Sequence, residues 1–278
     1  MATGHEDTLR VIEAGRAQHH YWSDLWRHRE LLYFLAKKDV LVRYKQTAIG
    51  LAWVLLKPAL TLLVFTIVFG RLANLPSGDV PYPILVFTGL LPWLFFASSI
   101  SDSGDSLSTN SALLTKIYFP RMIVPASTLL VNLLDFSLAG LLLVALMLFY
   151  GAYPDWRICA LPVLILLLLL TVAGLGLWLS ALSAKYRDFR YTIPFVVQLS
   201  LYASPVGYSS SLVPESWKAL FYLNPLAGII DGFRWALLGG RVELYLPGLV
   251  FSVAFAAIVV ITGAMYFRKT ERTLADAL

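Results

Sequence analysis

The histidines, the side chains used most often as general bases, are confined to the start of the chain. They are His5, His19, His20 and His28, so the rest of the chain has no imidazole for acid–base chemistry. No lysine follows a glycine, so the Gly-Lys of a phosphate-binding loop is missing. The lone Cys159 has no second cysteine for a disulfide or metal site, and we assign it to packing. We therefore expect no catalytic residue, no metal and no cofactor on this chain.

Ionisable residues inside apolar segments are the next candidates. Asp135 lies near the middle of an apolar run, one helical turn from Asn132. Such a carboxylate either faces a translocation path or bonds to a neighbouring helix, and the second alternative is favoured here. Asp231 and Arg234 stand three positions apart, so they can pair on one helix face in a structural role.

The composition is that of an integral membrane protein. Of the 278 residues, 58% are hydrophobic and only 14% are charged, whereas soluble proteins have roughly 25% charged residues. The first ten residues, MATGHEDTLR, are polar, so no signal peptide is visible. No region is long enough to form a basic soluble domain, which argues against nucleic-acid binding.

Apolar periodicity predicts an all-α polytopic protein with six spans. The predicted spans are about 50–72, 84–101, 122–150, 158–182, 191–207 and 245–267. A polar tail (1–21) and an amphipathic segment (22–49) precede them, and a tail (268–278) follows. The stretch after Ile100 is too hydrophilic to enter lipid. The segment 208–241 is divided by Pro225 into two halves, each too short to cross about 30 Å of hydrocarbon.

The amphipathic segment combines aromatic residues with many cations. Its aromatic stripe is Trp22, Trp26, Tyr33, Val40 and Tyr44, and Leu31, Leu35 and Val42 form a second apolar face. Its cations are Arg27, Arg29, Lys37, Lys38, Arg43 and Lys45. This pattern predicts either a helix that lies on the membrane and touches a protein partner, or a simple anchor before the first span.

Basic residues set the expected orientation. With both termini in the cytoplasm, most loop cations fall inside, and only Arg71, Arg157, Lys218, Arg234 and Arg241 fall outside. Aromatic residues are dense from Tyr202 to Trp235. An interfacial aromatic belt is the default explanation, although aromatic rings also stack on sugars.

Four segments together resemble the type-2 ABC exporter permeases of the O-antigen, capsule and teichoic-acid class. They are RYKQTAIGLAWVLLKP, NSALLTKIYFPRMIVP, LSAKYRDFRYTIPFVVQ and the pair YASPVGYSSSLVP and LNPLAGIIDGFRWALLG. They follow the family's order and cover nearly the whole chain after residue 21. The form RYKQT is closer to O-antigen permeases than to capsule permeases.

The resemblance implies roles for these segments. Residues 22–49 correspond to a cytoplasmic interface helix against an ATPase, with candidates Trp26, Arg29, Tyr33, Lys37, Lys38 and Arg43. Residues 110–121 correspond to a coupling segment, with candidates Leu113, Lys116, Tyr118, Phe119 and Arg121. Two short helices, about 212–222 and 226–238, correspond to a re-entrant periplasmic gate. The channel or gate candidates are Asp135, Asn132, Tyr202, Tyr208, Trp217, Phe221, Tyr222, Asp231 and Arg234.

The implied function is export across the bacterial inner membrane. The chain would form half of a homodimeric pore for a polyprenyl-diphosphate-linked polysaccharide, and two copies of a separate ATPase subunit would bind ATP and Mg. Within transport, the alternatives are a permease for capsule, teichoic acid, a lipid or a drug. The alternative from another class is a non-transporting membrane enzyme or scaffold of envelope assembly.

Overall fold

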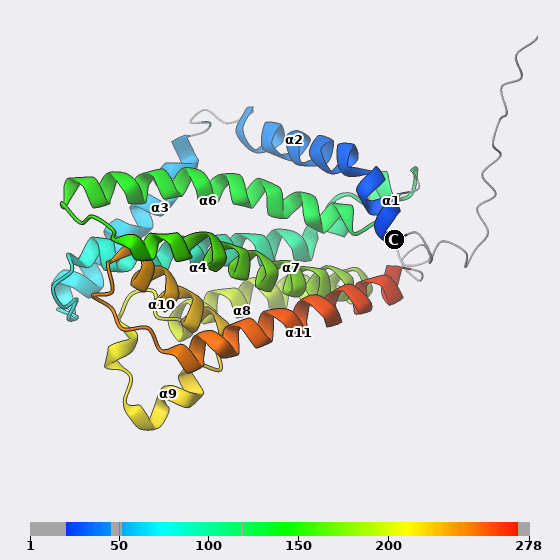
Figure 1. The fold of residues 1–278 in the computed structure, drawn as a ribbon. Coiled ribbons are helices and arrows are strands. Elements are labelled where there is room, and N and C mark those ends of the chain that lie inside the picture. Colours follow the sequence, from blue (N-terminus) through cyan, green and yellow to red (C-terminus); the bar gives the residue numbers. More distant parts are fainter. Residues whose placement is uncertain (1–20, 46–49, 51, 118, 272–278) are drawn as a thin grey trace, which may run out of the picture.

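The computed structural model describes residues 21–45, 50, 52–117 and 119–271, and all regular structure in these residues is helical. Figure 1 shows long helices that run side by side, with the short helices at the two ends of the bundle. We call the end that holds α1 (Tyr21–Arg27), α5 (Ser111–Leu114) and the last turn of α11 the basic end. We call the end that holds α9 (Glu215–Phe221) and α10 (Pro225–Leu237) the hairpin end.

Five segments in the described residues are long and apolar enough to cross a membrane. They are α3 (Ala52–Phe65) with its π-helical continuation Thr66–Leu72, α4 (Tyr82–Thr109), α6 (Ile123–Phe149), α7 (Leu161–Lys185) with the 3₁₀ turn Trp156–Ala160 before it, and α11 (Leu246–Glu271). The remaining predicted span corresponds to α8 (Phe189–Ala203), whose 15 residues extend only about 22 Å. The count of six spans therefore stays a prediction.

The second predicted span ends too early. It was expected to stop at residue 101, but α4 continues to Thr109 through a polar sequence. Ser103, Ser106 and Leu107 are buried in this extension, so packing keeps the helix intact. The 28 residues of α4 extend about 42 Å, which exceeds the roughly 30 Å hydrocarbon core. The polar turns can therefore remain helical without entering lipid.

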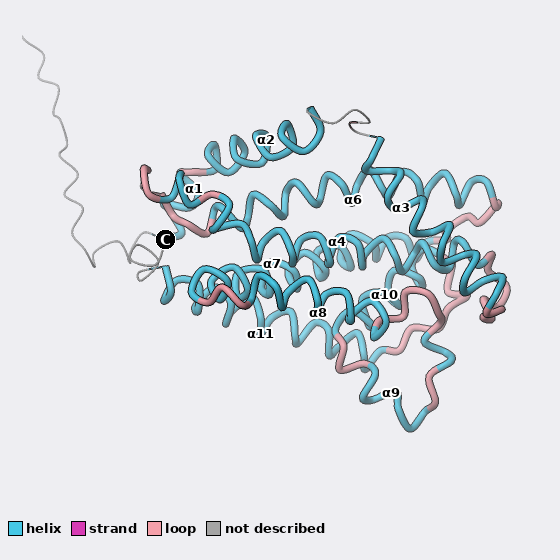
Figure 2. Tube along the Cα trace, turned by 180° about the vertical axis from the view of Figure 1, so that it is seen from behind, coloured by secondary structure: helices cyan, strands magenta, loops and turns pink. Residues whose placement is uncertain are grey.

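Helix α4 is the centre of the bundle. It contacts α3, α6, α7, α8 and α10, and Figure 2 shows it enclosed by these helices. In the most apolar 18-residue stretch of α4, 78% is buried inside the chain, against 17% to 33% in the matching stretches of the other four candidate spans. The other spans therefore present most of their apolar surface to lipid or to another chain.

Helices α7 and α11 pack through glycines. A Cβ atom added at Gly174 would lie 2.6 Å from the carbonyl carbon of Val259, and one added at Gly263 would lie 2.4 Å from the carbonyl oxygen of Gly174. Only glycine allows the two backbones to approach this closely.

The buried apolar side chains form two separate clusters. The larger one, the central core, is built around α4, α7 and α10. The smaller one, which we call the basic-end core, joins the ends of several helices. Its buried members are Leu35, Leu107, Leu114, Phe119, Met122, Ile123, Val124, Ala181 and Phe267. It holds α2 (Arg29–Lys45) and the residues around α5 against the ends of α4, α6, α7 and α11.

Candidate functional site

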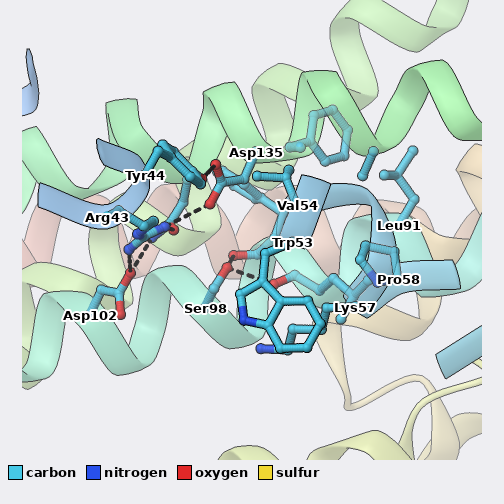
Figure 3. A pocket seen from close by; sticks show the side chains of 15 residues that line it. Arg43, Tyr44, Trp53, Val54, Lys57, Pro58, Leu91, Ser98, Asp102 and Asp135 are labelled. Carbon is cyan, nitrogen blue, oxygen red and sulfur yellow. Dashed lines mark hydrogen bonds and ion pairs between the residues drawn. The ribbon is translucent and has the colours of Figure 1, made fainter. Parts of the chain in front are cut away.

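Helix α2 is attached to the bundle by one arginine in its last turn. Arg43 Nη1 donates to Asp135 Oδ2 at 2.6 Å and to Asn132 Oδ1 at 3.0 Å, and Nη2 donates to Asp102 Oδ2 at 2.7 Å. Tyr44 OH donates to the other oxygen of Asp135. Figure 3 shows these side chains converging from α2, α4 and α6. We call this group the Arg43 cluster.

The cluster shows which groups bond to Asp135. Its carboxylate bonds to a neighbouring helix, since its partners Arg43 and Tyr44 both lie on α2. Burial lowers the pKa of Arg43, but the nearby Asp102 and Asp135 carboxylates outweigh it and raise the pKa above its ordinary value. The sequence reasoning missed Asp102, since it was placed in a loop rather than on α4.

A cavity of about 280 Å³ lies beside the Arg43 cluster, between α3, α4 and α6. Its polar end is the cluster itself. The rest of its wall consists of Trp53, Val54, Lys57, Pro58, Leu91, Leu94, Phe95, Ser98, Phe136 and Ala139. Small-molecule sites have volumes of about 300–1,000 Å³, so this cavity is too small to be the path of a polymer.

Two of the predicted interface residues, Trp26 and Tyr33, lie on the outer face of α1 and α2, whereas Arg43 points inward to its cluster. Trp26 is 71% and Tyr33 is 68% exposed, while the opposite face buries Leu35 in the basic-end core. Val42, which was expected on that apolar face, is exposed. The predicted single helix over 22–49 is also divided, since α1 ends at Arg27 and α2 begins at Arg29. The outer face of both helices is free to meet a membrane surface or a partner.

The remaining interface candidates are cations with different partners. The Arg29 guanidinium lies 5.5 Å from the ring centroid of Trp26. Lys37 is exposed. Lys38 Nζ pairs with Asp39 at 3.0 Å and also donates to Asn110 Oδ1 at 3.0 Å. The last contact links α2 directly to the predicted coupling segment.

The coupling segment 110–121 contains one short helix, α5, followed by turns. Leu113 is half-buried and Lys116 is exposed, whereas Phe119 is buried in the basic-end core. Phe119 therefore supports the segment from inside rather than presenting a surface. Tyr118 lies outside the described residues. Arg121 bonds to the end of α11, as described below.

Helix α10 of the predicted gate is part of the core, not a mobile surface. Arg234 is fully buried, and it donates to the carbonyl oxygens of Leu85, Val206 and Tyr208 at 3.2, 3.0 and 2.9 Å. The predicted pairing with Asp231 is confirmed, at 3.9 Å. Irregular backbone is tolerated at membrane depth only where its polar groups are satisfied, and Arg234 satisfies those that follow α8.

Helix α9 has the opposite character, with no buried residue. Trp217 is 60% and Tyr202 is 64% exposed, whereas Tyr222 is buried and donates to Asp231 Oδ2 at 2.6 Å. Phe221 is half-buried, and its ring centroid lies 6.3 Å from that of Tyr208. Figures 1 and 2 both show α9 standing away from the bundle. Among these candidates, Asp231 and Arg234 on α10 and their neighbour Tyr222 are therefore fixed in the core, whereas Trp217 on α9 and Tyr202 on α8 are exposed.

Comparison with known proteins decides which family has this arrangement. Residues 30–238 match the family described as ABC-2 type transporter. The chain belongs to the ABC-2 type transporter family. The match spans α2, the Arg43 cluster, the coupling segment and the whole hairpin of this ABC-2 protein.

Individual relatives cover almost the full length of the ABC-2 protein. It is 30% identical to the O-antigen export system permease protein RfbA of Myxococcus xanthus, over 92% of this chain and 98% of the relative. It is 27% identical to an RfbA of Klebsiella pneumoniae, over 90% and 95%. It is 20% identical to the polysialic acid transport protein KpsM of Escherichia coli, over 85% and 92%. The type-2 ABC permease fold predicted from the four segments is thus confirmed.

Proposed function

We propose that this ABC-2 chain is the permease subunit of an exporter that moves an O-antigen-type polysaccharide, linked to a polyprenyl diphosphate, across the bacterial inner membrane. The observation that carries the proposal is the match to an O-antigen export permease over 98% of that protein's length. The polysialic acid transporter matches at lower identity, which makes a capsule-type polymer the second candidate.

A separate ATPase subunit would drive the transport. The sequence offers no Gly-Lys phosphate-binding loop, so ATP and Mg would be bound by that partner. Helix α1 lies at the basic end, and α2 runs alongside α6 with its outer face exposed. Lys116 and Ile117, which follow α5, are also exposed. We take these exposed groups as the binding surface for the ATPase, with both termini in the cytoplasm.

Two copies of the chain would complete the pore. The cavity beside the Arg43 cluster is too small for a polymer, and most of the apolar surface of the spans other than α4 is not buried within one chain. A channel at the interface of two copies satisfies both observations, with one ATPase for each copy. Helix α9, exposed at the hairpin end, then lies where it can act as the outer gate.

The test is transport into inverted inner-membrane vesicles that contain this chain and the ATPase subunit that co-purifies with it. We expect ATP-dependent uptake of a radiolabelled polysaccharide carried on polyprenyl diphosphate. Vesicles without this chain are the control. Uptake of a capsule-type polymer with no uptake of the polyprenyl-linked one would overturn the assigned substrate. ATP-independent uptake of either would overturn the exporter itself.

A further inference from the structure

Three segments that are far apart in the sequence meet at the carboxylate of Glu271. Tyr21 OH donates to Oε2 at 2.9 Å, and the backbone N–H of Arg121 donates to Oε1 at 2.7 Å. Arg121 Nη1 also reaches the carbonyl oxygen of Glu271 at 3.4 Å. Figures 1 and 2 show α1 close to the last turn of α11. We call this group the Glu271 clamp.

Each bond of the clamp reaches a different part of the basic end. Tyr21 begins α1, Arg121 ends the predicted coupling segment, and Glu271 ends α11. Burial first, and then the nearby Glu271 carboxylate, raises the pKa of Tyr21 above its ordinary value. The phenol therefore stays protonated at neutral pH and remains a donor. The Arg268 guanidinium lies over the Tyr21 ring, 4.9 Å from its centroid.

The basic-end core joins the same segments as the clamp. Phe119 from the coupling segment and Phe267 from α11 are both buried in the basic-end core, together with Leu35 from α2. Lys38 of α2 adds a polar link to Asn110 at the start of the coupling segment. The interface helices, the coupling segment and the end of α11 are therefore joined by two polar ties and one apolar core.

The residues that hold the clamp are not the ones that define the family match. That match covers residues 30–238, so Tyr21 and Glu271 both lie outside it. Within the match, only Arg121 belongs to the clamp.

We propose that Glu271 is a positioning residue that holds α1 and the coupling segment against the end of α11, so that they move as one body when the ATPase moves. The proposal rests on the proposed function, since it names how that ATPase would be mechanically connected to the bundle. Without the clamp, the ATPase would displace the coupling segment alone, and ATP would be hydrolysed with little transport.

The first test compares variants of Glu271 and Tyr21 in the vesicle assay. Two charge-assisted bonds are lost in Glu271→Ala, and each shifts an open–closed equilibrium by roughly tenfold or more. We expect polysaccharide exported per ATP hydrolysed to fall by at least about tenfold, because the loss of either bond alone shifts the equilibrium by that factor. Glu271→Gln keeps an acceptor for the Arg121 N–H, so its export per ATP hydrolysed should be close to that of the unchanged protein. Tyr21→Phe should give an intermediate loss.

The matched control is Lys269→Ala, which changes an exposed side chain in the same helical turn. We expect it to export normally. A purely structural role for Glu271 would lower the amount of permease and of its ATPase complex together, and would leave the export per ATP of the surviving complex unchanged. That result, or normal export per ATP in Glu271→Ala, would overturn the proposal.

The second test measures the one-body motion directly, in a Cys159→Ser background. Spin labels are placed at Ala112 of α5 and Lys269 of α11, both of which are exposed. In the otherwise unchanged complex, the distance between the labels should be the same with and without ATP. In Glu271→Ala it should change on ATP binding. A distance that changes with ATP when Glu271 is present would contradict the clamp.

The two levels of the hypothesis fail differently. If the exporter assignment is wrong, the vesicles with Glu271 intact show no ATP-dependent uptake of polysaccharide. If only the clamp is wrong, those vesicles transport normally and the Glu271→Ala vesicles transport equally well.

Discussion

Arg43 Nη2 and Asp102 Oδ2 lie 2.7 Å apart, although the two residues are separated by 59 positions in the chain. The same guanidinium also bonds to Asp135, so a single side chain connects α2 with both α4 and α6. Because α2 carries the proposed ATPase surface, the Arg43 cluster is a direct polar connection from that helix to the centre of the bundle.

Replacing Arg43 should therefore weaken both the fold and the transport. In Arg43→Ala the carboxylates of Asp102 and Asp135 lose their shared partner. We expect the free energy of unfolding to fall by about 1–2 kcal/mol, less than for a fully buried pair because the Arg43 side chain is 36% exposed. Thermal unfolding of the purified protein measures the change. Arg27→Ala, an exposed arginine on α1, is the control, and an equal loss in both variants would contradict the role of the cluster.

Arg234 should be far less tolerant of substitution. Arg234→Met leaves three carbonyl groups without their donor and Asp231 without its cation. Breaking a buried ion pair costs about 3–5 kcal/mol, so little of the variant should accumulate in the membrane. Immunoblots of membrane fractions measure this.

The double variant Asp231→Leu with Arg234→Met removes both charges and should accumulate better than Arg234→Met alone. Arg241→Met changes an exposed arginine just beyond α10 and should leave the amount of protein unchanged. Normal accumulation of Arg234→Met would show that the hairpin does not need its buried arginine.

The exposed part of the coupling segment offers a surface that can be changed without disturbing the core. Lys116→Glu with Ile117→Asp alters two exposed side chains, so the fold should be retained while the ATPase detaches or hydrolyses ATP without export. Co-purification and the ratio of export to hydrolysis measure the two outcomes. Glu243→Lys, an exposed charge change at the hairpin end, is the control. Unchanged coupling in the double variant would remove this segment from the ATPase interface.

Phe119, in contrast, is a poor probe of coupling because its side chain is part of the core. It is 4% exposed in the basic-end core, so Phe119→Ala should lower the free energy of unfolding by about 3–5 kcal/mol. A loss of export in that variant would report loss of the fold and not loss of a contact with the ATPase.

The gate proposal is tested by joining the α9 helices of two copies. In a Cys159→Ser background, Trp217→Cys places a thiol on the exposed helix. Cross-linking should stop export, and reduction should restore it, because the two gates can no longer separate. A cysteine at Tyr153, exposed in a different loop, is the control. Full export with the α9 helices joined would show that α9 is a surface segment and not a gate.

The sequence predicted the long apolar helices well because each one carries its own signal. The predicted spans at 122–150 and 245–267 correspond to α6 and α11 within a few residues. The predicted short helix at 226–238 corresponds to α10, which begins at Pro225 behind an Asn224 cap. For the two spans local hydrophobicity was sufficient, whereas the short helix was expected from the family resemblance.

The misses have a common physical cause. Hydrophobicity reports whether a segment can enter lipid, not whether it is helical, so the polar end of α4 was read as a loop. Asp135 bonds to Arg43, 92 positions away in the sequence. Glu271 bonds to Tyr21, 250 positions away. No periodicity within a segment carries such a pairing, because it depends on how the helices come together.

The basic-end core also has a consequence for the order in which the protein is made. It combines Leu35, near the beginning of the described chain, with Phe267, near its end. Synthesis proceeds from the N-terminus, and the central helices can begin to associate while the ribosome is still at work. The surface formed by α1, α2 and the coupling segment, however, has no completed support until α11 has been translated and inserted. A nascent or truncated permease that lacks α11 would therefore lack part of the support for this surface. The ATPase subunit would then bind only chains that contain α11.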